Sequence, residues 1–283
     1  MDSGSGARHV FTVDVEDYFH SEVPDVEKWS SIPSRVERST ETVLELCAEA
    51  DVRGTFFVLG WVARRHPGLV RAIVAAGHEL ASHGSDHEFV YRMTPERFRS
   101  DIVRARDVLQ DITGVRVQGY RAPYFSIVAS TPWAYDVLAD AGYTFSSSVF
   151  PGRNRRYGIR GHPADPIRRA TTGGAAVWEA PITTFHGRIG CGGVYFRALP
   201  YPLFAAELAA GERAGRSVVF YIHPWEADPG KPAEGSLELR LRHGIGIRAT
   251  VPRLRRMFKS FAFGPLGPRL GVIPESLTPE MVH

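Results

Sequence analysis

Apolar and β-branched runs alternate along this chain with segments in which apolar residues recur every three or four positions. The short runs are typical of β-strands, and the spaced pattern is typical of amphipathic helices. The runs predict seven strands, at residues 9–15, 55–60, 78–82, 117–123, 143–151, 176–182 and 217–224. The spaced patterns predict helices over residues 35–50, 67–77, 94–113, 131–142, 203–214 and 251–261.

Strands that alternate with helices predict a largely parallel sheet. Runs such as FFVLG and VVFYI are apolar throughout, as expected of strands that are covered on both faces. No change of composition marks a domain boundary before about residue 228, and residues 228–249, rich in Gly, Pro and Arg, predict a long irregular excursion. We therefore expect a single barrel-like α/β domain.

The composition narrows the possible partners. With 43% hydrophobic residues, the 283-residue chain can bury a large core, and its net charge of +3 is too small to indicate binding to nucleic acid. No apolar stretch is long enough to span a membrane, and the start MDSGSGARHV lacks the apolar segment of a signal peptide. We expect a cytoplasmic protein or a processed fragment, without a membrane span.

Unusual polar residues follow or end five of the predicted strands, at the edge where parallel α/β sheets carry their active sites. Each of them alone has an ordinary structural explanation, but their common location predicts one site. They are Asp14, Glu16 and Asp17 (first strand), His83 and His87 (third), Arg121 (fourth), Glu179 (sixth), and His223 and Glu226 (seventh).

The residue types at these strand ends indicate a particular chemistry. Two imidazoles and one carboxylate bind Zn²⁺ and leave a coordination position open, although Co²⁺, Ni²⁺ and Mn²⁺ also suit this set. Such an ion lowers the pKa of bound water from about 15.7 towards about 7 and polarises a carbonyl oxygen. A second carboxylate can serve as general base, and a histidine across the cleft can protonate a leaving nitrogen. The set predicts metal-assisted hydrolysis of an amide or an ester.

The chain resembles the NodB-type polysaccharide deacetylases, carbohydrate esterase family 4, in VDVEDYFH, FVLGWVA, GHELASHGSDH, GYRAPYFS and FYIHPWE. These stretches, with the ending RMFKSFAFGPL, are most similar to the bacterial branch associated with exopolysaccharide and exosortase loci. The resemblance implies a distorted (β/α)7 barrel, the NodB homology domain. It implies one domain over residues 1–283, with a core at about 9–224 and a C-terminal extension at 225–283. It further implies removal of N-acetyl groups from an N-acetylated polysaccharide or oligosaccharide.

The same resemblance implies catalytic roles for individual residues. Asp14 matches the catalytic base, and Arg121 matches the group that orients it through a charge-assisted hydrogen bond. His83 and His87 match the metal ligands, and His223 matches the general acid.

Three further residues are expected at the substrate. The backbone N–H of Tyr124 is expected to help hold the oxyanion, and Pro123 and Tyr124 are expected to form part of the cleft wall. Trp225, next to the acid histidine, offers an aromatic face on which a sugar ring can stack.

The chain departs from the family pattern in two places. The usual adjacent aspartate pair is replaced by Asp14-Val15-Glu16-Asp17, so the third metal ligand is Glu16 if the strand continues and Asp17 if the chain turns after Val15. Ser146 stands where the family often has the aspartate that supports the acid histidine, and Glu226 and Glu179 are the candidates to replace it.

Two other functions stay open. The missing aspartate leaves room for a glycan-binding protein with a degraded catalytic site. The resemblance also allows a C–N hydrolase of the same fold that acts on a small amide, as some relatives do.

Overall fold

The computed structural model describes residues 9–154, 157–232 and 237–272. The seven predicted strands all lie parallel in one sheet, in the order β10-β1-β2-β3-β4-β5-β7. The fold-class prediction is therefore confirmed. These strands are β1 (His9–Val15), β2 (Thr55–Val58), β3 (Glu79–Ser82), β4 (Gly119–Tyr120), β5 (Phe145–Ser146), β7 (Ala176–Glu179) and β10 (Val219–Ile222).

The sheet curls so far that the segment after β7 reaches β10, on the other edge. Thr183 N donates to Val219 O at 3.2 Å, and Tyr221 N donates to Cys191 O at 3.3 Å. Strand pairing does not otherwise continue from β7 to β10, because the antiparallel strand β6 (Ile167–Ala170) follows β7 at that edge. The sheet is thus a barrel that is incompletely closed.

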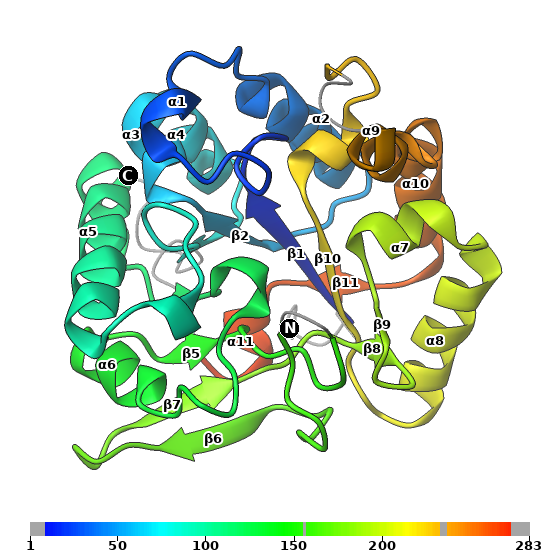
Figure 1. Cartoon of the computed structure of the whole chain (residues 1–283). Helices are drawn as coiled ribbons and strands as arrows, with labels where there is room; N and C mark the ends of the chain where they lie inside the picture. The colour runs from blue at the N-terminus through cyan, green and yellow to red at the C-terminus, as the bar shows by residue number, and fades with distance from the viewer. Residues whose placement is uncertain (1–8, 155–156, 233–236, 273–283) are drawn as a thin grey trace, which may run out of the picture.

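All six predicted helices are present and lie around the outside of the sheet (Figure 1). The longest, α5, begins where Thr94 Oγ1 accepts a hydrogen bond from Arg97 N and ends at Gly114, whose φ of +71° lies in the left-handed region. The helices are α2 (Val36–Glu49), α4 (Pro67–Ala75), α5 (Pro95–Thr113), α6 (Ala134–Asp140), α8 (Tyr201–Arg213) and α10 (Thr250–Ser260).

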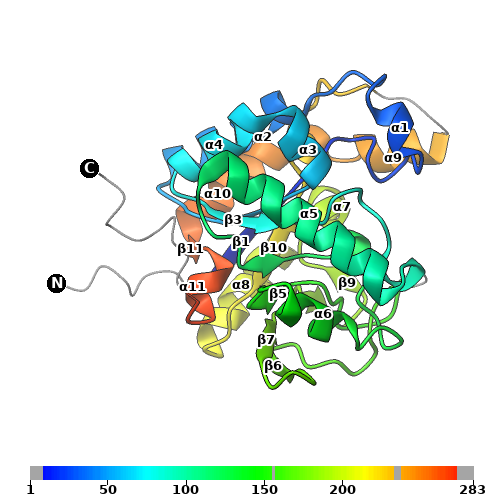
Figure 2. The same cartoon turned by 90° about the vertical axis from the view of Figure 1, so that its left-hand side faces the viewer.

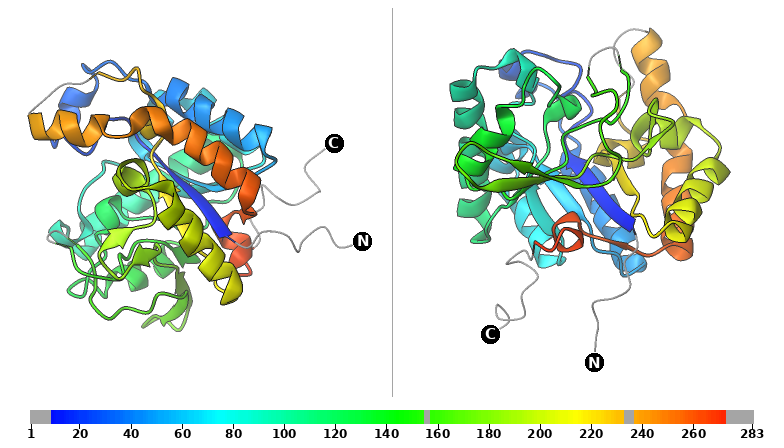
Figure 3. Two further views of the ribbon diagram at one scale, coloured as in Figure 1. Left: turned by 90° about the vertical axis from the view of Figure 1, so that its right-hand side faces the viewer. Right: turned by 90° about the horizontal axis from the view of Figure 1, so that it is seen from below.

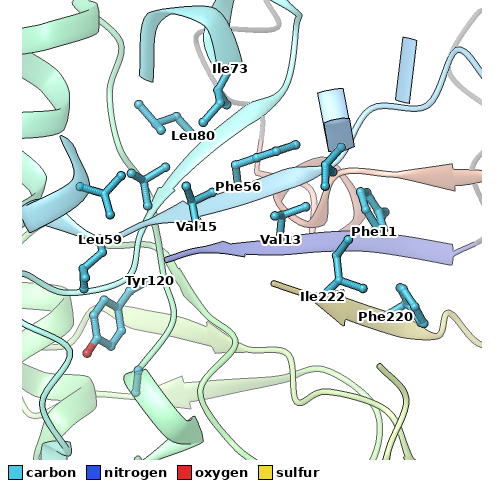
Figure 4. Close-up of a cluster of buried hydrophobic side chains, with 14 of the residues drawn as sticks. Phe11, Val13, Val15, Phe56, Leu59, Ile73, Leu80, Tyr120, Phe220 and Ile222 are labelled. Atoms are coloured by element: carbon cyan, nitrogen blue, oxygen red, sulfur yellow. The ribbon is translucent and has the colours of Figure 1, made fainter. Parts of the chain in front are cut away.

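Alternation along β1 separates the core from the site. Phe11, Val13 and Val15 are fully buried and pack in the main hydrophobic cluster with residues such as Phe56 and Ile222 (Figure 4). Because successive side chains of a strand point to opposite faces, Thr12 and Asp14 point to the inside of the curled sheet. Both contact Arg121 there.

Several short elements were not predicted. A two-residue strand outside a longer apolar run contains too little periodicity to detect, and a very short helix has no apolar face that repeats. They include α1 (Val26–Trp29), α3 (Gly60–Arg65), the hairpin of β8 (Thr184–Phe185) and β9 (Ile189–Gly190), α7 (Gly193–Ala198), β11 (Phe263–Gly264) and α11 (Leu266–Arg269).

The excursion expected at residues 228–249 is partly wrong, because it contains helix α9 (Leu237–Gly244) and a 3-10 turn at Ile247–Ala249. Helix α9 lies at the same end of the molecule as α1 (Figures 2 and 3). Its Arg242 forms an ion pair with Glu22, in the segment between β1 and α1, and His243 Nε2 lies 3.4 Å from the same carboxylate. Strand β11 pairs with the start of β1, at the end of the sheet away from α1 and α9. In the part of the chain that the structure covers, each helix is too short or too polar to cross a bilayer.

Candidate active site

The carboxyl ends of the parallel strands surround a cavity of about 570 Å³. Most of the predicted site residues lie on its wall. They are Asp14, Glu16, His83, His87, Tyr124, His223, Trp225 and Glu226.

Glu16, His83 and His87 form a compact cluster of potential metal ligands. One ligand atom from each lies within 4.8 Å of the other two, and all three side chains are buried. His83 Nδ1 lies 2.9 Å from the carbonyl oxygen of Arg121, so this nitrogen carries the proton and Nε2 keeps a free lone pair. Burial lowers the pKa of His83 to about 4, which keeps the ring neutral, as a metal ligand must be.

The cluster fits a divalent ion. Glu16 Oε2 lies 2.5 Å from His87 Nε2, yet within the described residues this buried oxygen has no hydrogen bond of acceptable geometry. Burial by itself raises the pKa of Glu16, but the charges of the nearby imidazoles, that of His87 first, outweigh burial and hold the pKa well below its usual range. An ionised oxygen that faces two histidines is what Zn²⁺ or a similar ion requires.

Asp17 lies in a different environment, so the alternative in which Asp17 is the third ligand does not agree with the geometry. Its Oδ2 accepts hydrogen bonds from Ser34 Oγ at 2.6 Å, Arg35 N at 2.8 Å and Val36 N at 3.2 Å, and its Oδ1 accepts one from Tyr18 N at 3.0 Å. The Asp17 carboxylate thus satisfies backbone N–H groups at the start of α2, a role that sequence spacing alone could not reveal.

The loop SHGSDH is shaped by its glycine. Gly84 has a φ of +75°, and a Cβ added there would lie 2.8 Å from Asp101 Oδ2. The same oxygen accepts a hydrogen bond from Ser85 N at 3.0 Å, while Gly84 O accepts one from Gly60 N at 2.8 Å. These contacts fix the turn that brings His83 and His87 together.

We expect Gly84→Ala to weaken Zn²⁺ binding by about 10-fold or more, the size of effect seen when groups that orient metal ligands are changed. The added methyl group meets the Asp101 carboxylate, and alanine is strained at this φ. Titration calorimetry with Zn²⁺ measures the effect. Gly114→Ala is the matched control, because Gly114 has a similar φ of +71° but no atom within 4 Å of an added Cβ. Equal affinities in the two variants would contradict the prediction.

Asp14 is held by a fully buried arginine. Arg121 Nη1 donates to Asp14 Oδ1 at 2.7 Å and to Thr12 Oγ1 at 2.8 Å. Its Nε and Nη2 donate to the backbone and side-chain oxygens of Ser147, and its guanidinium lies 4.2 Å from the centre of the Phe57 ring. With its donors used in this way, Arg121 has one orientation, and it fixes the Asp14 carboxylate at the edge of the cavity.

His223 directly follows β10, the strand that pairs with β1, and its partner is Glu226. His223 Nδ1 donates to Glu226 Oε2 at 3.0 Å, whereas His223 Nε2 lies 3.4 Å from Glu16 Oε1. Burial alone lowers the pKa of His223, but the hydrogen bond to Glu226 and the charge of Glu16 raise it to about 9. The bond to Glu226 thus favours the protonated ring that a general acid requires.

The other candidate, Glu179, and Ser146 itself form their hydrogen bonds elsewhere. Glu179 Oε1 accepts hydrogen bonds from Ser148 N and Val149 N, and its Oε2 accepts one from Tyr135 Oη. Ser146 Oγ donates to Ser148 Oγ.

The expected cleft wall is present in part. Tyr124 lines the cavity, and its ring stacks on Phe89 at 4.0 Å and packs edge-on against His87. Tyr124 itself has a φ of +57°, which turns its peptide group relative to the preceding strand. Pro123 does not line the cavity: it is buried beside the Gly84 turn, 3.9 Å from where a Cβ on Gly84 would lie.

Two residues that contact the partners of His223 were not predicted from the sequence. Arg197 donates from Nε to Glu226 Oε1 at 2.7 Å, and the His243 ring stacks on Trp225 with centroids 4.7 Å apart. Both residues lie far along the chain from Asp14 and His83, in segments without a recognisable motif. Only the three-residue spacing of His223 and Glu226 was visible in the sequence.

Two family descriptions match adjoining parts of the chain. Residues 29–146 match the polysaccharide deacetylase family, and residues 147–269 match a domain of unknown function, DUF3473. The second match includes His223 and Glu226, so the proposed acid side of the cavity belongs to a region with no assigned function.

Curated relatives match over shorter stretches. A peptidoglycan-N-acetylglucosamine deacetylase of Bacillus cereus is 27% identical over 96 residues, which are 34% of this chain and 35% of the relative. A chitooligosaccharide deacetylase of Bradyrhizobium is 32% identical over 101 residues, which are 35% and 43%. The chain thus matches less than half the length of these relatives.

Solved structures share the fold over nearly all of the chain. A Mycobacterium smegmatis protein described as a candidate polysaccharide deacetylase superimposes with a TM-score of 0.63 at 22% identity, over 99% of this chain and 98% of that one. The family 4 carbohydrate esterase of Streptomyces lividans gives a TM-score of 0.51 at 17% identity, over 93% of each chain. Residues 29–146 are thus similar in sequence to the polysaccharide deacetylase family, and nearly the whole chain shares the fold of these two solved structures.

Proposed function

We propose that the protein is a metal-dependent hydrolase that removes N-acetyl groups from an N-acetylated polysaccharide or oligosaccharide. The observation that carries the proposal is that one cavity brings together the Glu16, His83 and His87 cluster, the Asp14–Arg121 pair and His223. The names of the Bacillus cereus and Bradyrhizobium relatives support an N-acetylated glycan as the substrate.

The geometry supports a division of labour during hydrolysis. A divalent ion held by Glu16, His83 and His87 would supply Lewis acidity to water and to the acetyl carbonyl oxygen. Asp14 takes a proton from the water that adds to the carbonyl carbon, and the backbone N–H of Tyr124 helps to hold the developing oxyanion. His223 gives its proton to the sugar nitrogen as the C–N bond breaks. The products are acetate and a free amine.

A long substrate is favoured by a second cavity beside the first. This cavity, also of about 570 Å³, is lined by Phe89, Tyr91 and Arg92, among others, and it shares Ser21, His87 and Tyr124 with the main cavity. Tyr124 lies between the two, and its hydroxyl donates to Ser21 O. Binding surfaces on both sides of Tyr124 and His87 suit a chain of sugars better than a small amide, so the small-amide hydrolase is the less favoured alternative.

The alternative of a glycan-binding protein with a degraded catalytic site was suggested by Ser146, which replaces the family's usual aspartate. The bond between His223 and Glu226 supports catalysis instead, because it gives the acid histidine a charged partner without an aspartate on β5. We also propose that the protein belongs to the exopolysaccharide-associated branch of the family, because the stretches HPWE and RMFKSFAFGPL resemble sequences of that branch.

The test is acetate release from N-acetylglucosamine oligomers by the Zn²⁺-loaded protein. We expect turnover that a chelator removes and added Zn²⁺ restores. Glycan binding without acetate release from any N-acetylated glycan would favour the glycan-binding alternative. Turnover of small amides alone would favour the other hydrolase.

A further inference from the structure

His223 is joined to Glu226 by two hydrogen bonds. Glu226 Oε2 accepts from both the backbone N and the Nδ1 of His223, each at 3.0 Å. The short 3-10 turn Pro224–Ala227 allows this, because it returns the Glu226 side chain onto the residue that precedes the turn. The imidazole is thereby fixed with Nδ1 away from the cavity and Nε2 towards Glu16.

The other oxygen of Glu226 is held by Arg197. The distance from Arg197 Nε to Glu226 Oε1 is 2.7 Å, and both side chains are 1% exposed. The Arg197 Nη atoms donate to the carbonyl oxygens of Arg242, His243 and Ile245, at the end of α9. Arg197 therefore ties the carboxylate to a backbone segment that is distant in sequence.

Trp225 completes the support of the imidazole. Its ring stacks on His223 with centroids 5.4 Å apart and an interplanar angle of 19°, and on its other side it meets His243 at 4.7 Å and 25°. The Arg197 guanidinium lies 5.4 Å from the centre of the Trp225 ring. These groups all come from residues 147–269, the region that matches a domain of unknown function.

We infer that Arg197 and Glu226 are positioning residues for the acid histidine, and that the region of unknown function completes the active site by supplying them. This inference rests on the proposed function. Glu226 orients the ring so that its Nε2–H points at the leaving nitrogen, and Arg197 keeps the carboxylate from turning away.

The test compares the rates at which each variant hydrolyses two substrates. An N-acetylated sugar releases a poor leaving group that needs a proton, whereas an aryl acetate releases a phenolate that leaves without one. In Glu226→Gln, a single side-chain oxygen must replace two, so His223 Nδ1 and Arg197 Nε cannot both keep an acceptor. We expect kcat for the N-acetylated oligosaccharide to fall by about 10-fold or more, with KM and aryl acetate hydrolysis changed less than about 3-fold, since general acids contribute about 10²–10⁴-fold.

Arg197→Lys is the second variant and decides the test if Glu226→Gln does not fold. Lysine keeps the charge but lacks the fork that reaches both Glu226 and α9, so we expect the same shift in the ratio of amide to aryl acetate turnover, at a smaller size. The matched control is Glu179→Gln, which changes another buried carboxylate that does not contact His223. We expect this control to keep the wild-type ratio.

The outcomes separate the two proposals. If the Zn²⁺-loaded wild type releases no acetate from N-acetylated glycans, the proposed function fails. If the wild type is active but both positioning variants keep its ratio of turnovers, the function stands and the positioning role is overturned.

Discussion

His83→Ala is expected to lose the metal and, with it, turnover. His83 is one of three buried ligands, and its hydrogen bond to Arg121 O presents Nε2 towards Glu16 and His87. Without it, one imidazole and one carboxylate remain. We expect Zn²⁺ affinity to fall by more than about 100-fold, beyond the 10–100-fold typical of changes to groups behind the ligands. Metal content after dialysis, measured by mass spectrometry, checks the loss.

The control for this prediction is His78→Ala. His78 is also a buried histidine, but it precedes β3 at the end away from the cavity, where its Nδ1 accepts a hydrogen bond from Gly54 N. This variant removes the same volume and is expected to keep the metal. Metal retained by His83→Ala at wild-type stoichiometry would remove His83 from the proposed site.

Asp14→Asn is expected to give the opposite combination, with metal retained and turnover lost. Asparagine has the size of aspartate, and its amide oxygen can still accept the hydrogen bond from Arg121. It cannot accept a proton from water. Loss of a general base predicts a fall in kcat of about 100-fold or more, with KM little changed. Acetate release and metal content, measured on the same sample, check both halves.

Asp17→Asn distinguishes the two readings of the carboxylate cluster. If Asp17 serves the start of α2, this variant is less stable to heat but keeps metal and turnover per folded molecule. A loss of metal from Asp17→Asn, with Glu16→Gln unaffected, would restore the alternative in which Asp17 is the third ligand.

The regular part of the fold was predictable because its signals are local. Seven strands and six helices carry enough apolar periodicity to be recognised, and the Gly and Pro residues that end them have the conformations expected, as at Gly114. The strand ends were also predictable, and with them the cavity residues Asp14, His83, His87 and His223. A parallel sheet brings the carboxyl ends of its strands to one edge whatever the details of the loops.

The elements that sequence missed have no such signal. β8, β9 and β11 are two residues long, and they are strands only because a distant segment offers hydrogen-bond partners, as β1 does for β11. Residues 228–249 were expected to be irregular because their Gly, Pro and Arg content resembles a loop. Within them, α9 is anchored through contacts that its own sequence does not encode, namely those of Arg197 and Glu22.

The sequence by itself determined the strand–helix order, the histidine pair and the side of the sheet on which the chemistry lies, because these depend on spacing within short segments. Only the tertiary structure decided between equivalent side chains. It placed the Asp17 carboxylate at the start of α2 and left Glu16 for the histidines, and it gave His223 the support of Glu226 and not of Glu179. Each choice depends on which donors the folded chain brings within about 3 Å of a carboxylate, and hydrogen bonds of that kind join residues whose separation along the chain carries no pattern.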